Sequence, residues 1–303
     1  MIRNIFRSKP KQVLPRSCVI DFALGDERET VIQLLRRVCP FLAQEGADPK
    51  QIDLTQIEYL GPFAVAILFA NSQAERLAGH SHEILLPIER PKVMGFARFS
   101  GLHHRLDGGP APDVSHPDNQ TVPLEIVQKA TWKVANPVIE LVRRHVVISD
   151  DDETYLRNSV TEVIQNVEDH AESAIGAVYC ARFLKKPRKI RVAIVDRGLG
   201  IGTTLIRKHP EIRSTEVALR RVVDGGISAR SKPNNLGLGI SNLWRQITQQ
   251  LGGEIFIVTE GAIGYSDHTG HLCTSNVGAH FAGTGVFFTV PVVDKENDRA
   301  RNN

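Results

Sequence analysis

Residues 190–202 read Ile190-Arg-Val-Ala-Ile-Val-Asp196-Arg-Gly198-Leu-Gly200-Ile-Gly202. The apolar run predicts a buried strand, and the spaced glycines after it predict a tight turn where a ligand can approach the backbone. A carboxylate at a strand end can accept a hydrogen bond from an exocyclic amine such as that of adenine. We therefore expect Asp196 and the three glycines to border a ligand site.

The segment 153–174 has the apolar periodicity of a helix, with the acidic run 150–152 placed to cap its start. Glu162, Asn166 and His170 follow one another at intervals of four and therefore share a second, polar stripe. An amide oxygen suits Mg²⁺ beside phosphates, and a carboxylate can orient or deprotonate a water. A plain solvated helix face is the alternative explanation of this stripe.

A second glycine cluster, Gly237-Leu238-Gly239-Ile240, leads directly into a helix predicted over 240–251. Free backbone N–H groups at the start of a helix bind phosphate. Neither glycine cluster has the GxGxxG pattern of dinucleotide-binding folds, and the chain contains no GxxxxGK[ST] motif. These absences exclude both the dinucleotide fingerprint and the P-loop.

The order of these motifs resembles that of the GHKL ATPase superfamily, which includes gyrase, heat-shock chaperones, mismatch-repair ATPases and histidine kinases. Residues 162–170 resemble the family's N-box, 196–200 its G1 box and 237–240 its G2 box. Residues 283–291 resemble its closing Gly-Thr turn and final strand. The resemblance covers about 150–292.

The resemblance implies that ATP and Mg²⁺ bind to this half of the chain. It makes Asn166 the Mg²⁺ ligand, Glu162 the general base, and Asp196 the acceptor for the adenine amine. The other residues with an implied contact to the nucleotide are Gly198, Gly200 and Gly202 at the adenine and ribose, Gly237, Leu238 and Gly239 at the phosphates, Thr284 at the adenine end, and Arg230 and Lys232 in a lid.

Near the N-terminus, residues 52–64 resemble the central segment of STAS domains, the small α/β modules of anti-sigma-factor antagonists. That family places a serine at the turn before a helix, and partner switching phosphorylates it. Here Gly61-Pro62-Phe63 stands at the turn without a hydroxyl, which rules out phosphorylation there if the alignment holds. An ordinary α/β domain whose Pro62 begins a helix is the alternative.

The fold class we expect is α+β, with a C-terminal two-layer sandwich of GHKL type and a smaller N-terminal STAS-like domain. In the C-terminal domain, helices should cover one face of a mixed sheet. The expected divisions are a tail over 1–14, the STAS-like domain over 15–105, a linker over 106–122, the ATP-binding domain over 123–293, and a tail over 294–303.

The pattern of apolar residues locates the individual elements. Helices are expected over 30–43, 62–78, 153–174, 216–223 and 240–251, with one or two more between 125 and 146. Strands are expected over 17–24, 51–57, 81–86, 178–184, 189–195, 254–259 and 286–290. For 260–282 we expect a hairpin. A metal site at His268, His271 and Cys273 is disfavoured because no fourth ligand follows.

Composition limits the class of protein. The chain has 303 residues, 42% hydrophobic and 23% charged, which is typical of a soluble globular protein. A net charge of +3 does not indicate a strongly basic surface for binding nucleic acid. No apolar stretch is long enough to span a membrane. The four cysteines lie far apart with no CxxC pair, so a reducing, cytoplasmic setting fits best.

Three functions stay open at this stage. The first, which we favour, is a regulatory switch with slow ATP hydrolysis that couples nucleotide state to binding of a regulatory protein partner. The second is a kinase acting on a separate protein; the chain has no histidine phosphoacceptor segment of its own. The third is an ATP-gated binding module without turnover. The partner's identity and a homodimer are left undecided by the sequence.

Overall fold

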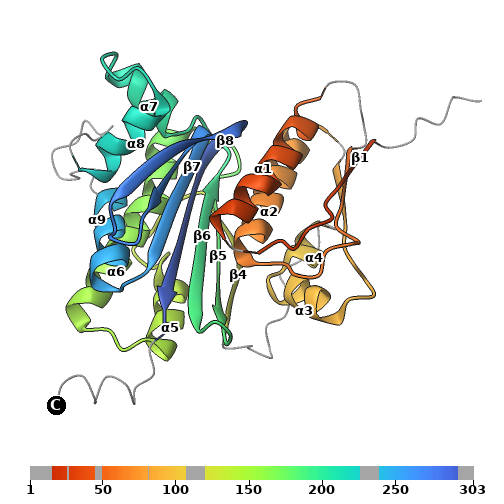
Figure 1. Ribbon diagram of the computed structural model, residues 1–303, viewed down its shortest axis with the longest axis horizontal. Coiled ribbons are helices and arrows are strands. Elements are labelled where there is room, and N and C mark those ends of the chain that lie inside the picture. The colour runs from red at the N-terminus through yellow and green to blue at the C-terminus, as the bar shows by residue number, and fades with distance from the viewer. Residues whose placement is uncertain are drawn as a thin grey trace, which may run out of the picture.

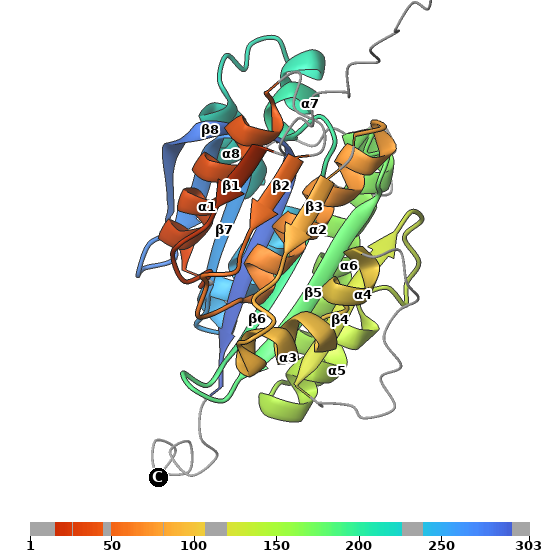
Figure 2. The same cartoon turned by 90° about the vertical axis from the view of Figure 1, so that its right-hand side faces the viewer.

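The computed structural model describes residues 16–25, 27–44, 50–80, 82–106, 120–225 and 239–292. These residues form four layers, which are seen edge-on in Figure 1 and from the side of the smaller sheet in Figure 2. From one side to the other, the layers are a group of helices, a five-stranded sheet, a pair of helices and a three-stranded sheet. The α+β class is confirmed.

The N-terminal unit, residues 16–106, contains the three-stranded sheet, which is parallel with strand order β1-β2-β3. Its strands are β1 (Arg16–Val19), β2 (Lys50–Asp53) and β3 (His82–Leu85), and its helices are α1 (Arg28–Leu42), α2 (Pro62–Leu77), α3 (Pro91–Phe99) and α4 (Leu102–Leu106). β2 is shorter than expected because the Asp53 carboxylate accepts a hydrogen bond from the Thr55 backbone N–H at 2.8 Å and closes a turn.

The C-terminal unit, residues 120–292, contains the five-stranded sheet with strand order β4-β5-β6-β8-β7. Every neighbouring pair is antiparallel, so the expectation of a mixed sheet is wrong. The strands are β4 (Thr121–Val127), β5 (Ala177–Leu184), β6 (Lys189–Asp196), β7 (Glu254–Ser266) and β8 (Leu272–Pro291). β7 and β8 pair along their length, which confirms the hairpin expected over 260–282.

The helices of this unit gather on one face of its sheet (Figure 1). They are α5 (Asn136–His145), α6 (Asp150–Asn166), α7 (Ile201–Lys208), α8 (Thr215–Val223) and α9 (Gly239–Arg245), with π-helical turns η1 (Val167–Ala171) after α6 and η2 (Gln246–Gln250) after α9. α7 is not among the expected helices. The start of α6 is capped by the Ser149 hydroxyl, which accepts from the Asp152 backbone N–H at 3.1 Å.

One helix, α5, lies between 125 and 146 as expected, but it does not begin at 125, since 121–127 is the edge strand β4. Pro123 lies within it, at a register shift between Val122 and Glu125. An edge strand tolerates proline because the missing N–H interrupts few ladder hydrogen bonds. The helix begins only at Asn136, with Pro137 in the first turn, where a proline lacks no intrahelical donor.

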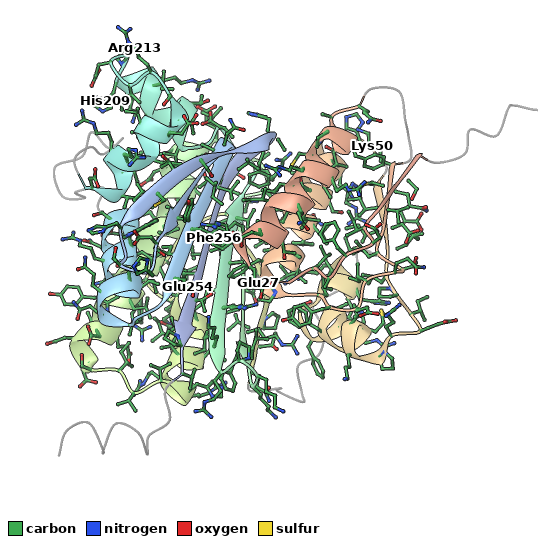
Figure 3. All side chains as sticks on the ribbon, viewed as in Figure 1. Glu27, Lys50, His209, Arg213, Glu254 and Phe256 are labelled. Atoms are coloured by element: carbon green, nitrogen blue, oxygen red, sulfur yellow. The ribbon has the colours of Figure 1, made fainter. Side chains whose placement is uncertain are left out.

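Both faces of the five-stranded sheet are covered, whereas we expected helices on one face only. The first eleven residues of α2, 62–72, are all buried, because this helix lies between the two sheets. The Phe63 ring lies 5.6 Å from that of Phe256 on β7 and 5.1 Å from that of Phe287 on β8. Figure 3 labels Phe256 on the side of the sheet that faces α1 and α2. One hydrophobic core therefore joins the two units.

The middle of β8 also packs on the N-terminal unit. Val277 and Phe281 are buried in the shared core, and Arg36 on α1 donates a hydrogen bond from Nε to the Val277 carbonyl at 2.6 Å. The hairpin therefore extends the sheet surface against which α1 packs. In the part of the chain that the structure describes, no helix combines the length and the apolar character needed to cross a membrane.

Candidate functional site

The glycine turn after β6 brings Asp196 to the inner end of a cavity. Asp196 is the last residue of β6 and is only 3% exposed. Its carboxylate accepts hydrogen bonds from the backbone N–H groups of Gly198, at 2.8 Å, and of Thr284. Burial raises the pKa of this carboxyl to about 6, while the two hydrogen bonds and nearby Arg197 act in the opposite direction. The site therefore holds a buried acceptor that is largely ionised at neutral pH.

The cavity lies between the sheet and the helices α6, α7 and α9. Its walls are mainly apolar, with few polar groups, as in many small-molecule sites. The lining residues are Val163, Asn166, Val167, His170, Ala171, Ile194, Asp196, Gly200, Ile201, Thr204, Leu205, Val222, Ile240, Thr284 and Val286. Asn166, Asp196, Gly200 and Thr284, four of the residues singled out in the sequence, thus meet around one space.

Asn166 and His170 reach the cavity in different ways. Asn166 ends the α-helical part of α6, and His170 belongs to the π-helical turn that follows. Both line the cavity, as their spacing of four predicts. The helix nevertheless stops before the expected residue 174, because Glu172 adopts a left-handed conformation with φ 52°. This early stop turns the chain toward β5.

Glu162 lies one turn before Asn166, beside the first residue of α9. A Cβ added to Gly239 would come within 2.6 Å of the Glu162 Cβ. Any larger residue at 239 would therefore displace Glu162 or α9. Glu162 is not among the residues that line the cavity, but it lies against Gly239, which belongs to the expected phosphate-binding segment.

The three glycines after Asp196 have different surroundings. Gly200 precedes α7 with φ +85°, a conformation that favours glycine, and it lines the cavity. A Cβ on Gly198 would lie 1.9 Å from the Ala171 carbonyl oxygen, and one on Gly202 would lie 2.1 Å from Glu260 Oε2. Gly198 and Gly202 therefore serve close packing of the turn against its neighbours.

Residues that the sequence reasoning missed hold the start of α7. The Thr259 hydroxyl accepts from the Ile201 backbone N–H at 2.9 Å and donates to the Gly283 carbonyl at 3.0 Å. The Glu260 carboxylate accepts from the Thr203 backbone N–H at 3.0 Å and from the Thr215 hydroxyl at 3.0 Å. These two side chains replace the cap that Gly200 cannot provide.

A local signal could have found α7 but not its caps. Ile201 and Leu205, four residues apart, are the apolar pair that faces inward. Thr259 and Glu260 come from β7, more than fifty positions away in the chain, and Glu260 has φ 54° at a register shift. No spacing rule connects them with the glycine turn.

Arg230, Lys232, Gly237 and Leu238 lie outside the described residues. Around the disfavoured metal site, His271 Nδ1 lies 2.7 Å from the Thr269 hydroxyl. Within the described ranges, no group of three or more His, Cys, Asp or Glu side chains is arranged to hold a metal ion.

A scan of the chain against protein-family models found no match, and a search among curated proteins found none either. The geometry alone thus defines the class of site: a mainly apolar cavity between an antiparallel sheet and its helices, with one buried carboxylate at its end.

Proposed function

We propose that the cavity binds ATP together with Mg²⁺, and that the protein is a slow ATPase switch which couples nucleotide state to binding of a protein partner. The observation that carries this proposal is the buried Asp196 carboxylate at the end of a mainly apolar cavity. The order of the GHKL-like motifs along the chain supports the same ligand.

The adenine ring suits the inner end of the cavity. Ile194, Val286 and Leu205 offer apolar surface for a flat ring. Asp196 would accept a hydrogen bond from the exocyclic amine, since its carboxylate is held in place by two backbone N–H groups. A ligand with a carbonyl at that position would meet a negative charge instead. The site is therefore expected to prefer adenine over guanine.

The metal and phosphates suit the outer end, where α6 and α9 meet. The Asn166 side chain would hold Mg²⁺, which supplies positive charge beside the phosphates when bound. Glu162, one turn away, would accept a proton from the attacking water. Because Gly239 has no side chain, Glu162 can lie directly against the start of α9.

The N-terminal unit would be the part that recognises the partner. Its parallel three-stranded sheet with α1 and α2 on one side supports the STAS-like resemblance. Gln51 and Glu83 on neighbouring strands share a hydrogen bond of 2.9 Å on the side exposed to solvent. That polar outer surface is available to a second protein chain.

Single-turnover incubation with γ-phosphate-labelled ATP and Mg²⁺ tests the function. The purified protein is measured alone and with the products of neighbouring genes, and phosphate release and protein labelling are followed together. Free phosphate without labelling supports the switch with slow turnover, whereas label on a second protein would make the chain a kinase. Bound ATP with neither outcome would leave a binding module. Absence of ATP binding would overturn the proposal.

Glu162→Ala separates binding from turnover. The variant is expected to keep its affinity for Mg·ATP and to lose phosphate release. Glu140→Ala is the matched control, because Glu140 lies on α5 with its side chain 65% exposed and forms an ion pair with Arg144. Phosphate release that persists in Glu162→Ala would mean that Glu162 is not the base.

A further inference from the structure

Asp196 and Arg197 are consecutive, but they face opposite sides of the five-stranded sheet. The Asp196 carboxylate borders the cavity. The Arg197 guanidinium lies over the Phe281 ring, 5.0 Å from its centroid, and donates from Nη1 to the Ala282 carbonyl at 2.6 Å. Phe281 is 1% exposed and belongs to the core shared with α1 and α2. Arg197 therefore lies on the side where the N-terminal unit is docked.

The N-terminal unit places two ionisable side chains near Arg197, of which only Glu75 is charged at neutral pH, because burial raises the pKa of the Cys39 thiol to about 11. Burial lowers the pKa of the Arg197 guanidinium, whereas Cys39 on α1, Glu75 on α2 and Asp196 act to raise that pKa. The carboxylate of Glu75 lies 3.7 Å from the Lys50 ammonium at the start of β2, which Figure 3 labels beyond α1. A part-buried guanidinium is stabilised by a carboxylate and by polar partners around it. The position of α2 thus helps to decide where Arg197 rests.

The segment 282–284 joins Arg197 to the cavity. Its first residue, Ala282, accepts the hydrogen bond from Arg197, and its last, Thr284, donates its backbone N–H to Asp196 and lines the cavity. Between them, Gly283 has φ +111°, and a Cβ there would lie 2.2 Å from the Asp196 carbonyl oxygen. Because Gly283 is packed closely against the Asp196 backbone, a displacement of Arg197 would also shift Thr284 in the cavity wall.

We propose that Arg197 is a positioning residue through which docking of the N-terminal unit sets the shape of the cavity. This inference rests on the proposed binding of ATP. Coupling between two sites is reciprocal, so nucleotide affinity would depend on the docked position of α2, and the stability of docking would depend on bound nucleotide. The N-terminal unit then acts on the site from the opposite face of the sheet, without touching the ligand.

A double-mutant cycle on the full chain tests the coupling. The dissociation constant for Mg·ATP is measured by calorimetry for wild type, Arg197→Met, Glu75→Gln and the double variant. Arg197→Met is expected to weaken binding by about fivefold to tenfold, and Glu75→Gln by a smaller factor. The double variant should lose less than the product of the two single factors, because both changes act on one interaction. Arg197→Lys, which keeps the charge, should recover part of the affinity.

A second readout distinguishes positioning from a simple loss of stability. Amide hydrogen exchange in α1 and α2 should slow when Mg·ATP binds to wild type, and Arg197→Met should remove that response. Arg207→Met is the control for loss of an arginine, since Arg207 on α7 is 58% exposed and pairs with Glu172. Circular dichroism confirms that every variant is folded at the temperature of the measurements.

Each outcome has a separate meaning. If wild type binds ATP but Arg197→Met and Glu75→Gln bind it equally well, the positioning role is overturned and the proposed ATP site stands. Strictly multiplicative effects in the double variant would also overturn it, because Arg197 and Glu75 would then act independently. If wild type does not bind ATP, the proposed function fails, and the inference that rests on it fails with it.

Discussion

The two faces of the five-stranded sheet differ in how they are filled. On the face toward the N-terminal unit, the rings of Phe63, Phe256 and Phe287 pack against one another in a shared core. On the other face, the end of β6 borders a cavity and holds a buried carboxylate. The first face is built for cohesion between units, and the second leaves space for a ligand at some cost in stability.

Phe63→Ala would break the closely packed face and is the largest effect we expect. Removing a fully buried phenylalanine ring leaves a cavity and costs about 3–5 kcal/mol of unfolding free energy. Because the core is shared, both units should lose stability in one transition. Chemical denaturation followed by circular dichroism and tryptophan fluorescence measures this change.

The control for Phe63→Ala is Tyr155→Ala, on α6, where the ring is 64% exposed. That variant should change the unfolding free energy by less than about 0.5 kcal/mol. Two separate transitions in Phe63→Ala, with the second at its wild-type position, would mean that the C-terminal unit does not depend on the interface.

Asp196→Asn would test the destabilising charge on the cavity face. The folded pKa of about 6 lies above the ordinary value of 3.8, so the folded state holds the proton more tightly than the unfolded state. Stability from this group is therefore fully present below about pH 4 and is lost as pH rises to about 6. Over this range of pH the free energy of unfolding of wild type should fall by about 3 kcal/mol because of this group, and Asp196→Asn should not show this fall.

The measurement is the difference in unfolding free energy between wild type and Asp196→Asn across this range of pH. Titrating groups far from Asp196 contribute to both proteins and largely cancel in the difference. A difference that does not change with pH would mean that Asp196 is ionised with an ordinary pKa in the folded protein.

Much of the fold can be predicted from local patterns. The helices over 30–43 and 62–78 and the strands over 178–184 and 189–195 lie where the apolar periodicity predicts them. The second covered face of the sheet was also visible in β6, where Ile190, Val192 and Ile194 face one core and Ala193 and Val195 the other. An unbroken apolar strand of this kind indicates burial on both faces. The expectation of one covered face did not take this pattern into account.

The site was predictable only in part. The spacing of Asn166 and His170 on one helix, and the strand end at Asp196, correctly bring these residues to one cavity. The caps of α7 could not be predicted, because Thr259 and Glu260 reach it through a register shift in β7 and a positive φ at Glu260. The orientation of Arg197, opposite to that of Asp196, follows from strand alternation, but its neighbours on α1 and α2 do not.

Gly200→Ala tests the backbone at the cavity face, and we expect it to have a smaller effect. An alanine here would have to adopt φ +85°, and its Cβ would lie 2.8 Å from the Thr259 hydroxyl and from Glu260 Cγ. Strain together with loss of the α7 cap should cost about 1–3 kcal/mol. Gly252→Ala is the control, since Gly252 has φ +59° but no atom within 4 Å of an added Cβ. Equal losses in thermal stability would mean that backbone strain accounts for the whole effect and that the close contacts add nothing.

Asn166→Ala should have the smallest effect on stability and a large effect on binding. Asn166 is half-buried at the end of an α-helical segment, and alanine favours helix, so the unfolding free energy should change by less than about 1 kcal/mol. Without the side-chain amide, Mg·ATP binding measured by calorimetry should be abolished, whereas Asn158→Ala, at an exposed position two turns earlier, should bind normally. Retained affinity in Asn166→Ala would remove Asn166 from the site. A loss of binding with stability unchanged would show that the cavity face serves the ligand and contributes little to cohesion.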